Sequence, residues 1–393
     1  MNGRERIMTA LKHGTPDRVP STPDISIMIP TLLSGAYFYD PIDITMAYIK
    51  AARHFEIDGW MFNGSLNYKT NSKITFETKT IKDTYDVKEY LTIMHTPDGD
   101  LTSKTVAPRD VPSTTTEKFV KDIKEDYKKL RHMFTFEYLD YDKTYYLEQK
   151  KEMGDTGMIC CFIDCPGFQH YSGWMDLEEL TYAYYDYPEI FEEICELHHK
   201  QCIRKMELAT DAGVESILTG GSGSITLQSP DLFRKLSLPT IKEITKMAKE
   251  AGIVSGIHSC GKEYSLIEMC ANETDLDYVN PIEVRPQGDC DLADIKNKFG
   301  SKLALMGNLH TSRVMLGPLD LVRLESLKCI RDAAPGGGFV LSTGDQCGKN
   351  TSLENIFEIV KVARDFGTYP LDMDKINEEI HRLEKKGVRI PDA

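Results

Sequence analysis

The sequence contains no run of twenty uninterrupted apolar residues, which argues against an ordinary membrane-spanning helix. Residues 1–6 are polar and lack the apolar segment of a secretory signal peptide. Basic residues are in the minority, because 47 lysines and arginines face 61 aspartates and glutamates, leaving a net charge of −14. Since phosphate backbones require a basic face, we expect no nucleic acid as a partner. These features together predict a cytoplasmic protein with no membrane segment.

Disulfides are not expected either, because ten cysteines in a reducing compartment do not form a disulfide framework. Most of them, including Cys160, Cys161 and Cys195, lie in apolar or helical runs typical of small core residues. Hydrophobic residues make up 41% of the 393-residue chain, which is enough to bury a large core without covalent links. The open question is whether a few of the cysteines bind a metal ion.

The first third of the sequence predicts helices, short extended segments and one β-rich insertion. Residues 74–107 alternate threonine, isoleucine, valine and tyrosine, and residues 97–100 have the composition of a hairpin turn. We therefore predict an antiparallel β insertion at about 74–107. The other expected elements are helices over 4–12, 44–56 and 117–133, an extended piece at 18–20 and a buried strand at 59–63.

From residue 158 onward, apolar strands alternate with helical patterns, and this alternation predicts a parallel sheet with crossover helices. About eight such units favour a closed (β/α)8 barrel of the TIM type over an open doubly wound sheet. No linker divides the chain, so we expect one α/β barrel domain over residues 1–393, with the β insertion near its N-terminus. The strands expected in this part are 158–163, 216–219, 254–258, 277–281, 303–307 and 339–341.

Polar or reactive residues follow most of these strands, where a parallel barrel carries its functional loops. Asn63, Asp164 and Asn308 are the candidates for contact with a substrate. The glycine-rich loop 220–223 would let a ligand approach the backbone closely, or it is only a tight turn. The residues expected to face one mouth are Asn63, Asp164, His258, Cys260, Glu283, Asn308, His310, Asp345 and Cys347.

His258 and Cys260 form the sharpest local pattern. Residues i and i+2 at the end of a strand lie on the same side, so an imidazole and a thiolate can converge on one ion. Zinc favours nitrogen and sulfur ligands, and a catalytic zinc site takes three protein ligands and leaves one position open. The alternative is a buried cysteine beside a histidine that hydrogen-bonds to a backbone carbonyl.

Two further segments bear on this site. Residues 342–348 follow the last expected strand and place Asp345 and Cys347 where a third ligand would come from, or they form only a glycine-bounded turn. Glu283 follows another strand and is a candidate fourth ligand or catalytic proton carrier, with a merely structural carboxylate as the alternative.

Several of these segments together resemble the uroporphyrinogen decarboxylase superfamily, in the right order and over nearly the whole chain. This resemblance implies a TIM-type barrel. The segments that carry it are residues 4–6, 16–20, 229–233, 258–261, 280–283, 307–308 and 351–355.

The superfamily contains two chemistries. Uroporphyrinogen decarboxylases carry an arginine-rich segment near the N-terminus that holds the porphyrin carboxylates. This chain has no arginine between Arg18 and Arg53, so decarboxylation of a porphyrinogen is not expected. The other branch is similar to methylcobalamin:coenzyme M methyltransferases, which carry zinc on a His-x-Cys…Cys motif.

The resemblance to that branch implies zinc on His258 and Cys260. Counted from the Thr-x-x-Glu-Asn segment, the third family cysteine falls nearer Asp345 than Cys347. Either residue is a candidate third ligand, and we prefer Cys347 because a thiolate is the softer zinc ligand.

The predicted function is therefore a zinc-dependent methyltransferase that exchanges a methyl group between a corrinoid and a small substrate, either a methoxylated aromatic or a thiol. The corrinoid (cobalamin) would arrive on a partner protein, because the chain has no Asp-x-His-x-x-Gly segment. An apolar pocket for an aromatic substrate is expected from Tyr37, Phe38, Tyr39, Phe62 and Tyr68. The alternatives are a decarboxylase or lyase on the same barrel, and a non-catalytic protein that binds corrinoid or metal.

Overall fold

Seven parallel strands form the central sheet of the computed structural model, which describes residues 1–391. Their order follows the chain, so each strand pairs with the one that precedes it and the one that follows it in this sheet. All six pairings are parallel, as the alternation of strands and helices predicts. The strands are β1 (Gly59–Gly64), β8 (Gly157–Phe162), β9 (Ser216–Gly220), β10 (Val254–Ser259), β11 (Tyr278–Pro281), β12 (Ala304–Leu309) and β13 (Phe339–Thr343).

An extended segment, residues 20–24, closes the barrel between β13 and β1. The backbone N–H of Thr22 donates to the carbonyl of Leu341 on β13, at 2.9 Å. On the other side, the N–H of Asp58, just before β1, donates to the carbonyl of Ser21 at 2.9 Å. Prolines at positions 20 and 23 lack an N–H, so this segment makes fewer backbone hydrogen bonds to its neighbours than a regular strand does. The segment nevertheless occupies the position of an eighth strand between β13 and β1, which confirms the predicted barrel.

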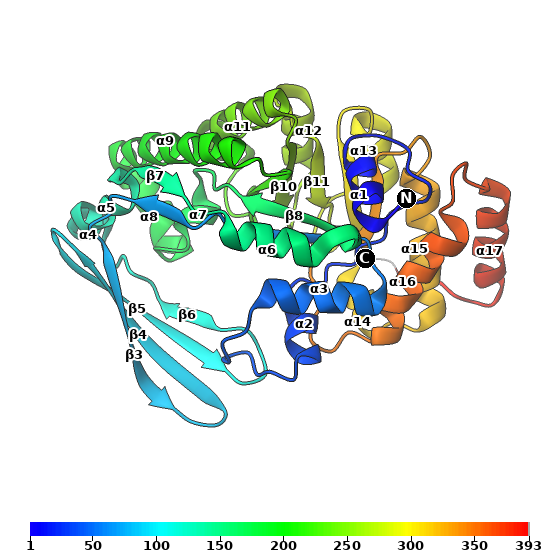
Figure 1. The fold of residues 1–393 in the computed structure, drawn as a ribbon, viewed down its shortest axis with the longest axis horizontal. Helices are drawn as coiled ribbons and strands as arrows, with labels where there is room; N and C mark the ends of the chain where they lie inside the picture. Colours follow the sequence, from blue (N-terminus) through cyan, green and yellow to red (C-terminus); the bar gives the residue numbers. More distant parts are fainter. Residues whose placement is uncertain (392–393) are drawn as a thin grey trace.

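The barrel interior is filled by alternate side chains of its strands. They form one buried cluster that includes residues of α1 (Gly3–Leu11). Within it, the indole N–H of Trp60 donates to the Tyr278 hydroxyl at 3.0 Å. Arg4 pairs with Glu215, just before β9, so α1 covers the amino-terminal end of the barrel (Figure 1). The opposite, carboxyl-terminal end is therefore left as the functional mouth.

Amphipathic helices surround the barrel and bury their apolar faces on it. None of the helices within residues 1–391 has both the length and the apolar character required to cross a bilayer. The longer helices are α3 (Ile44–Phe55), α6 (Thr144–Met153), α8 (Leu177–Asp186), α9 (Pro188–Ala212), α11 (Leu238–Ala251), α12 (Tyr264–Glu273), α13 (Leu292–Phe299), α15 (Leu319–Ala333), α16 (Leu353–Phe366) and α17 (Met373–Lys385). The shorter ones are α2 (Met28–Leu33), α7 (Phe168–Tyr171), α10 (Pro230–Leu236) and α14 (Thr311–Leu316).

The predicted β insertion is confirmed as a four-stranded antiparallel sheet, which we call the arch sheet. Its strands are β3 (Thr75–Asp83), β4 (Val87–Thr96), β5 (Gly99–Pro108) and β6 (Thr114–Glu117). The helix expected over 117–133 is wrong at its start. Glu117 ends strand β6 and pairs with Lys104 of β5 instead, and Asp122 caps a shorter helix, α4 (Ile123–Leu130), which is followed by α5 (His132–Thr135).

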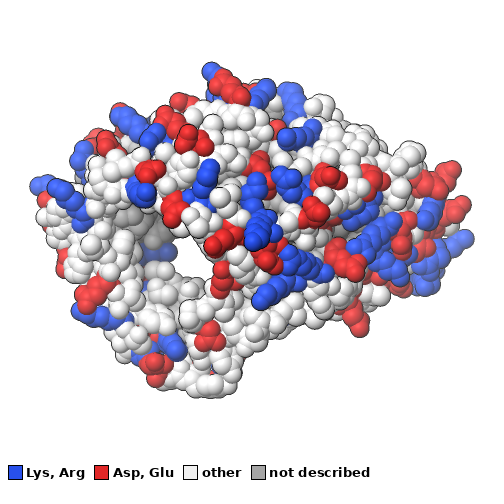
Figure 2. All heavy atoms as spheres, viewed as in Figure 1, with Lys and Arg blue, Asp and Glu red and all other residues white. Residues whose placement is uncertain are grey.

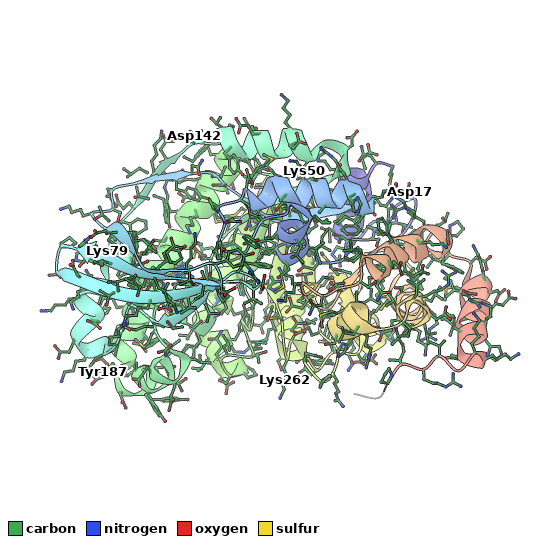
Figure 3. All side chains as sticks on the ribbon, turned by 90° about the horizontal axis from the view of Figure 1, so that it is seen from below. Asp17, Lys50, Lys79, Asp142, Tyr187 and Lys262 are labelled. Atoms are coloured by element: carbon green, nitrogen blue, oxygen red, sulfur yellow. The ribbon has the colours of Figure 1, made fainter. Side chains whose placement is uncertain are left out.

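The arch sheet lies on the carboxyl-terminal side of the barrel, because it is inserted between β1 and α6. A small pair, β2 (Tyr68–Thr70) with β7 (Tyr138–Tyr141), joins it to the barrel. At its far end the Tyr39 hydroxyl donates to the carbonyl of Tyr85 in the β3–β4 turn. Figure 2 shows the molecule hollowed between the arch sheet and the barrel, and Figure 3 shows Lys79 on the arch sheet at the opposite end of the molecule from α17. A ligand can reach the mouth through this hollow.

Candidate metal centre

Three ligand-type side chains converge at the mouth. One donor atom from each of Cys260, Glu283 and Asp345 lies within 4.8 Å of the other two. They follow β10, β11 and β13, so the parallel strands bring together residues that are far apart in the sequence. Two carboxyl groups and a thiol are suitable donors for a divalent cation.

His258 stands beside this group, although it is not a member of it. The Nδ1 atom of His258 lies 2.7 Å from the Oδ1 atom of Asn280. An amide oxygen only accepts, so Nδ1 carries the proton and the lone pair of the imidazole is on Nε2. A histidine that binds a metal through one nitrogen commonly donates its other N–H in this way.

Negative charge accumulates around the three converging groups. Burial, and then the nearby Asp345 carboxylate, raise the pKa of Glu283 to about 7, against a hydrogen bond from the Gly261 N–H at 2.5 Å. Burial and the same carboxylate raise the pKa of the Cys260 thiol to about 11. A divalent cation would relieve this repulsion and favour the ionised forms.

Two carboxylates of this region were missed from the sequence. Burial and Asp345 raise the pKa of Asp24, which ends the closing segment and whose N–H donates to the Thr343 hydroxyl at 2.9 Å. Glu263 is fully buried, and its Oε2 accepts from the Glu283 N–H at 2.9 Å. Its Oε1 has no hydrogen-bond partner within residues 1–391. Asp24 was foreseeable had residues 20–24 been recognised as a strand, whereas no local pattern marks Glu263.

Cys347, the preferred third ligand, is not one of the three converging residues. Its side chain is 1% exposed, in the main hydrophobic core, and its N–H donates to the carbonyl of Asp24 at 2.7 Å. Burial, and secondarily Asp24, raise the pKa of the Cys347 thiol to about 12. Asp345, the alternative, is the residue of this loop that reaches Cys260. With His258 nearby, the donors of this centre fit zinc.

The candidate substrate residues lie in three different surroundings. Asn63, near the end of β1, accepts a hydrogen bond from the Gln149 amide on its carbonyl. Asp164 forms an ion pair with Lys205 at 2.5 Å, and although burial opposes it, the ammonium lowers the pKa of Asp164 to about 2. Asn308 points toward the helix layer, where its Oδ1 lies 3.6 Å from the Cys329 thiol of α15.

Asp164 also belongs to a second group of ligand-type residues. One donor atom each of Asp164, His170 and His198 lies within 4.8 Å of the others. The centroids of the two imidazole rings lie 4.2 Å apart with the rings tilted by 38°, and burial lowers the pKa of both histidines. Because the Lys205 ammonium already neutralises Asp164, this group is an ion pair with neutral imidazoles beside it.

The expected aromatic pocket is not formed as one unit. Tyr37 and Tyr39 contact each other beside the arch sheet, and Phe62 packs on Trp60 in the barrel. Tyr68 packs on Tyr138 in the β2–β7 pair. These side chains project from different elements, which the spacing of aromatic residues alone does not reveal.

Comparison with known proteins places this barrel in a family. The chain matches the uroporphyrinogen decarboxylase (URO-D) family over residues 120–366. It belongs to the URO-D family. The resemblance carried by the sequence motifs is thereby confirmed.

One solved structure shares this fold over nearly its whole length. A methyltransferase from Methanosarcina mazei is similar with a TM-score of 0.62 and 16% identity, covering 93% of this chain and 99% of that one. A sugar phosphate isomerase/epimerase from Parabacteroides distasonis has a TM-score of only 0.30 and 13% identity, covering 55% of this chain and 85% of that one. Comparison with curated proteins gives no match. The first likeness shows a shared fold.

Proposed function

We propose that this URO-D family protein is a zinc-dependent methyltransferase, which exchanges a methyl group between a corrinoid carried by a partner protein and a small substrate. The convergence of Cys260, Glu283 and Asp345 at the barrel mouth is the observation that carries the proposal. Likeness to a methyltransferase over 93% of the chain supports it.

The proposed ligands are Cys260, Asp345 and the Nε2 atom of His258. A zinc ion held by them would supply Lewis acidity, which favours the thiolate of a thiol substrate or the phenolate released from a methoxylated aromatic. The Asn280 amide orients the His258 ring through its hydrogen bond.

Glu283 is proposed as the proton carrier. The Gly261 N–H fixes its Oε2, so this carboxyl group is held beside the other two donors rather than free in solvent. In that position it can accept a proton from the substrate heteroatom, or return one to it when transfer runs in the other direction.

The hollow beneath the arch sheet provides the approach to this centre (Figure 2). A small substrate would enter there, and the corrinoid partner would present its methyl group at the same mouth. Substrate and corrinoid would then meet at the strand ends, where a barrel of this type carries its reactive groups.

The test measures zinc and methyl transfer in the same preparations. Purified protein should hold about one zinc ion per chain, and it should demethylate methylcobalamin in the presence of a thiol or phenolate acceptor. The Cys260→Ala variant should lose both properties while its far-UV circular dichroism is unchanged. Cys270→Ala, in the buried core on α12, is the matched control and should keep zinc. Wild-type protein that binds no added zinc would refute the proposal.

A further inference from the structure

The loops that follow β10 and β11 are tied to each other by hydrogen bonds. The Gly261 N–H donates to the Oε2 of Glu283 at 2.5 Å, and the Glu283 N–H donates in return to the Oε2 of Glu263 at 2.9 Å. The N–H groups of Glu263 and Tyr264 both donate to the Oδ1 of Asp289, at 2.8 Å and 3.0 Å. Each loop therefore holds the other in place beside the metal centre.

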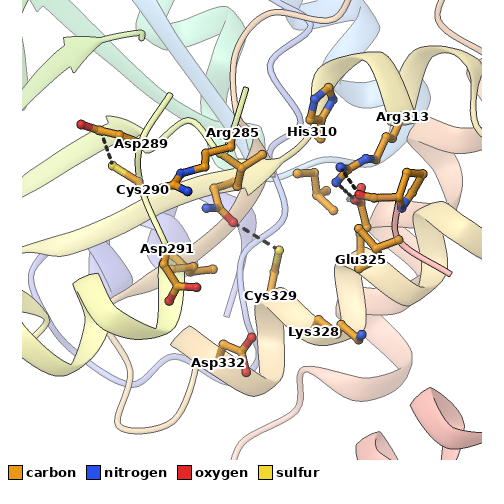
Figure 4. Close-up of a pocket in the computed structure, with 16 residues that line it drawn as sticks. Arg285, Asp289, Cys290, Asp291, His310, Arg313, Glu325, Lys328, Cys329 and Asp332 are labelled. Carbon is orange, nitrogen blue, oxygen red and sulfur yellow. Dashed lines mark hydrogen bonds and ion pairs between the residues drawn. The ribbon is translucent and has the colours of Figure 1, made fainter. Parts of the chain in front are cut away.

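The loop after β11 is packed incompletely on one side. A cavity of about 710 Å³ lies there, and the loop residues that line it include Val284, Arg285, Asp289 and Cys290 (Figure 4). Figure 4 also shows the Asp289 carboxylate beside the Cys290 thiol, whose Sγ atom lies 3.7 Å from its Oδ1 atom. Because the cavity provides few packing contacts, the position of this loop depends strongly on its hydrogen bonds to residues 261–264.

The backbone is strained directly before Glu283. Ile282 is buried and has a φ of +63°, in the left-handed region that β-branched residues rarely adopt. Such a conformation costs free energy and persists only where the surrounding contacts enforce it. Glu263 accepts from the N–H of the peptide that joins Ile282 to Glu283, and the Glu283 carbonyl accepts from the Cys290 N–H at 3.1 Å. These two contacts hold the strained segment.

Glu263 is a costly residue for the stability of the fold. Its side chain is 0% exposed, and only one of its two carboxyl oxygens has a hydrogen-bond partner within residues 1–391. An apolar side chain of similar size would avoid the cost of burying this group. Departures of this kind from stable packing are expected at functional sites. The side chain of Glu263 is used for the hydrogen bond to the Glu283 main chain.

We infer that Glu263 is a positioning residue of the metal centre. It holds the main chain of Glu283, so that the Glu283 carboxyl group stays beside the other two converging donors. The inference rests on the proposed function in one respect, which is the role of Glu283 as the proton carrier. Since Glu263 is not itself one of the converging donors, its loss should slow methyl transfer and leave the zinc ion bound.

Hydrogen exchange of the zinc-free full chain, followed by mass spectrometry, tests the positioning directly. Glu263→Met replaces the carboxyl group with an apolar side chain of similar length, and Glu263→Asp keeps the carboxyl group but shortens its reach. In both variants the amides of residues 282–290 should exchange about tenfold faster than in the wild type, or more. Glu263→Gln keeps an acceptor oxygen in the same place and should exchange like the wild type.

Glu358→Met is the matched control for a general loss of stability. Glu358 is a buried carboxylate on α16 that pairs with Arg323 at 2.6 Å, and within residues 1–391 it has no hydrogen bond to either loop. This variant should melt at a lower temperature and leave exchange in residues 282–290 unchanged. Equally fast exchange in the control would overturn the inference, and so would unchanged exchange in both Glu263→Met and Glu263→Asp.

Methyl transfer measures the consequence for the reaction. With methylcobalamin and the acceptor that the wild type uses, Glu263→Met should lower kcat about 10- to 100-fold while KM for the acceptor and the zinc content are kept. Glu263→Gln should restore kcat. An unchanged kcat in Glu263→Met, or a loss of zinc along with activity, would overturn the assignment. A wild type without zinc or methyl transfer would refute the proposed function alone, because exchange in the zinc-free protein still decides whether Glu263 positions Glu283.

Discussion

His258 and Asn280 are register partners on neighbouring parallel strands, and the Nδ1–H of His258 donates to the Oδ1 of Asn280 at 2.7 Å. The barrel itself therefore fixes the tautomer and orientation of the imidazole. The direction of its Nε2 atom is therefore set by the pairing of β10 with β11 and not by a loop.

Replacing Asn280 with alanine should weaken zinc binding 10- to 100-fold, because the His258 ring loses the partner that orients it. Competition with a chromogenic chelator measures the affinity. Asn272→Ala, on the exposed side of α12, serves as the control and should leave the affinity unchanged. Equal affinities in the two variants would exclude His258 as an oriented ligand.

Asp345→Asn should reduce zinc affinity by orders of magnitude, whereas Cys347→Ala should retain zinc. Asp345 reaches Cys260, while the Cys347 thiol is enclosed in the core. X-ray absorption at the zinc edge should accordingly show one sulfur ligand per ion. A spectrum with two sulfurs would reverse this assignment and restore Cys347.

Asp58→Ala should lower the free energy of unfolding by about 3–5 kcal/mol, because Arg18 loses the carboxylate with which it pairs and Arg6 keeps only Asp17. The Asp58 side chain accepts from Arg6 at 2.6 Å, from Arg18 at 3.0 Å and from the Ser21 N–H at 2.9 Å. It thus holds the closing segment against β1. Urea denaturation measures the effect, and Glu152→Ala, from an exposed ion pair, should change little.

Lys205→Met should destabilise the protein mainly near neutral pH, and its deficit in unfolding free energy relative to the wild type should narrow as the pH falls. In the wild type the pKa of Asp164 is about 2, below the ordinary value of about 3.9, so its ionisation stabilises the fold above about pH 5 and this contribution is lost as the pH falls toward 2. Without the ammonium, burial raises this pKa, so the Asp164 carboxylate no longer stabilises the fold at pH 7 and acid removes less stability from the variant than from the wild type.

Urea denaturation between pH 3 and 7 compares this variant with Lys200→Met. Lys200 lies on the same helix, α9, but its ion pair with Glu196 is exposed. The Lys200 variant should follow the wild-type profile. Parallel profiles for both variants would show that Lys205 does not set the pKa of Asp164.

Much of the fold was predictable because periodicity reports burial directly. Strands such as β9 and β13 are buried along their whole length, and their apolar runs end in polar turns. The start of α4 was not predictable. The helix was expected to begin at residue 117, but Glu117 pairs with β5 as the last residue of β6. An extended piece was predicted only at 18–20, and the closing segment at 20–24 was not recognised, because its place between the first and last strands depends on contacts across the whole chain.

The sequence predicted which strand ends carry the site residues, but it did not predict which of their side chains come into contact. Strand-end position correctly brought Cys260, Glu283 and Asp345 to one mouth. It did not distinguish Asp345 from Cys347, because the strand end does not determine which side chain of the following loop reaches Cys260. It also placed Asn308 among residues facing the mouth, whereas its side chain turns to α15.

The closing segment gives the barrel a late final step during synthesis. The hydroxyl of Ser342 donates to the carbonyl of Thr22 across 320 residues of sequence. A ribosome must therefore release β13 before residues 20–24 find both neighbours, and until then the nascent barrel exposes the edges of β1 and of its latest strand. A growing chain with such open edges depends on rapid completion, or on a chaperone, to avoid pairing with another copy.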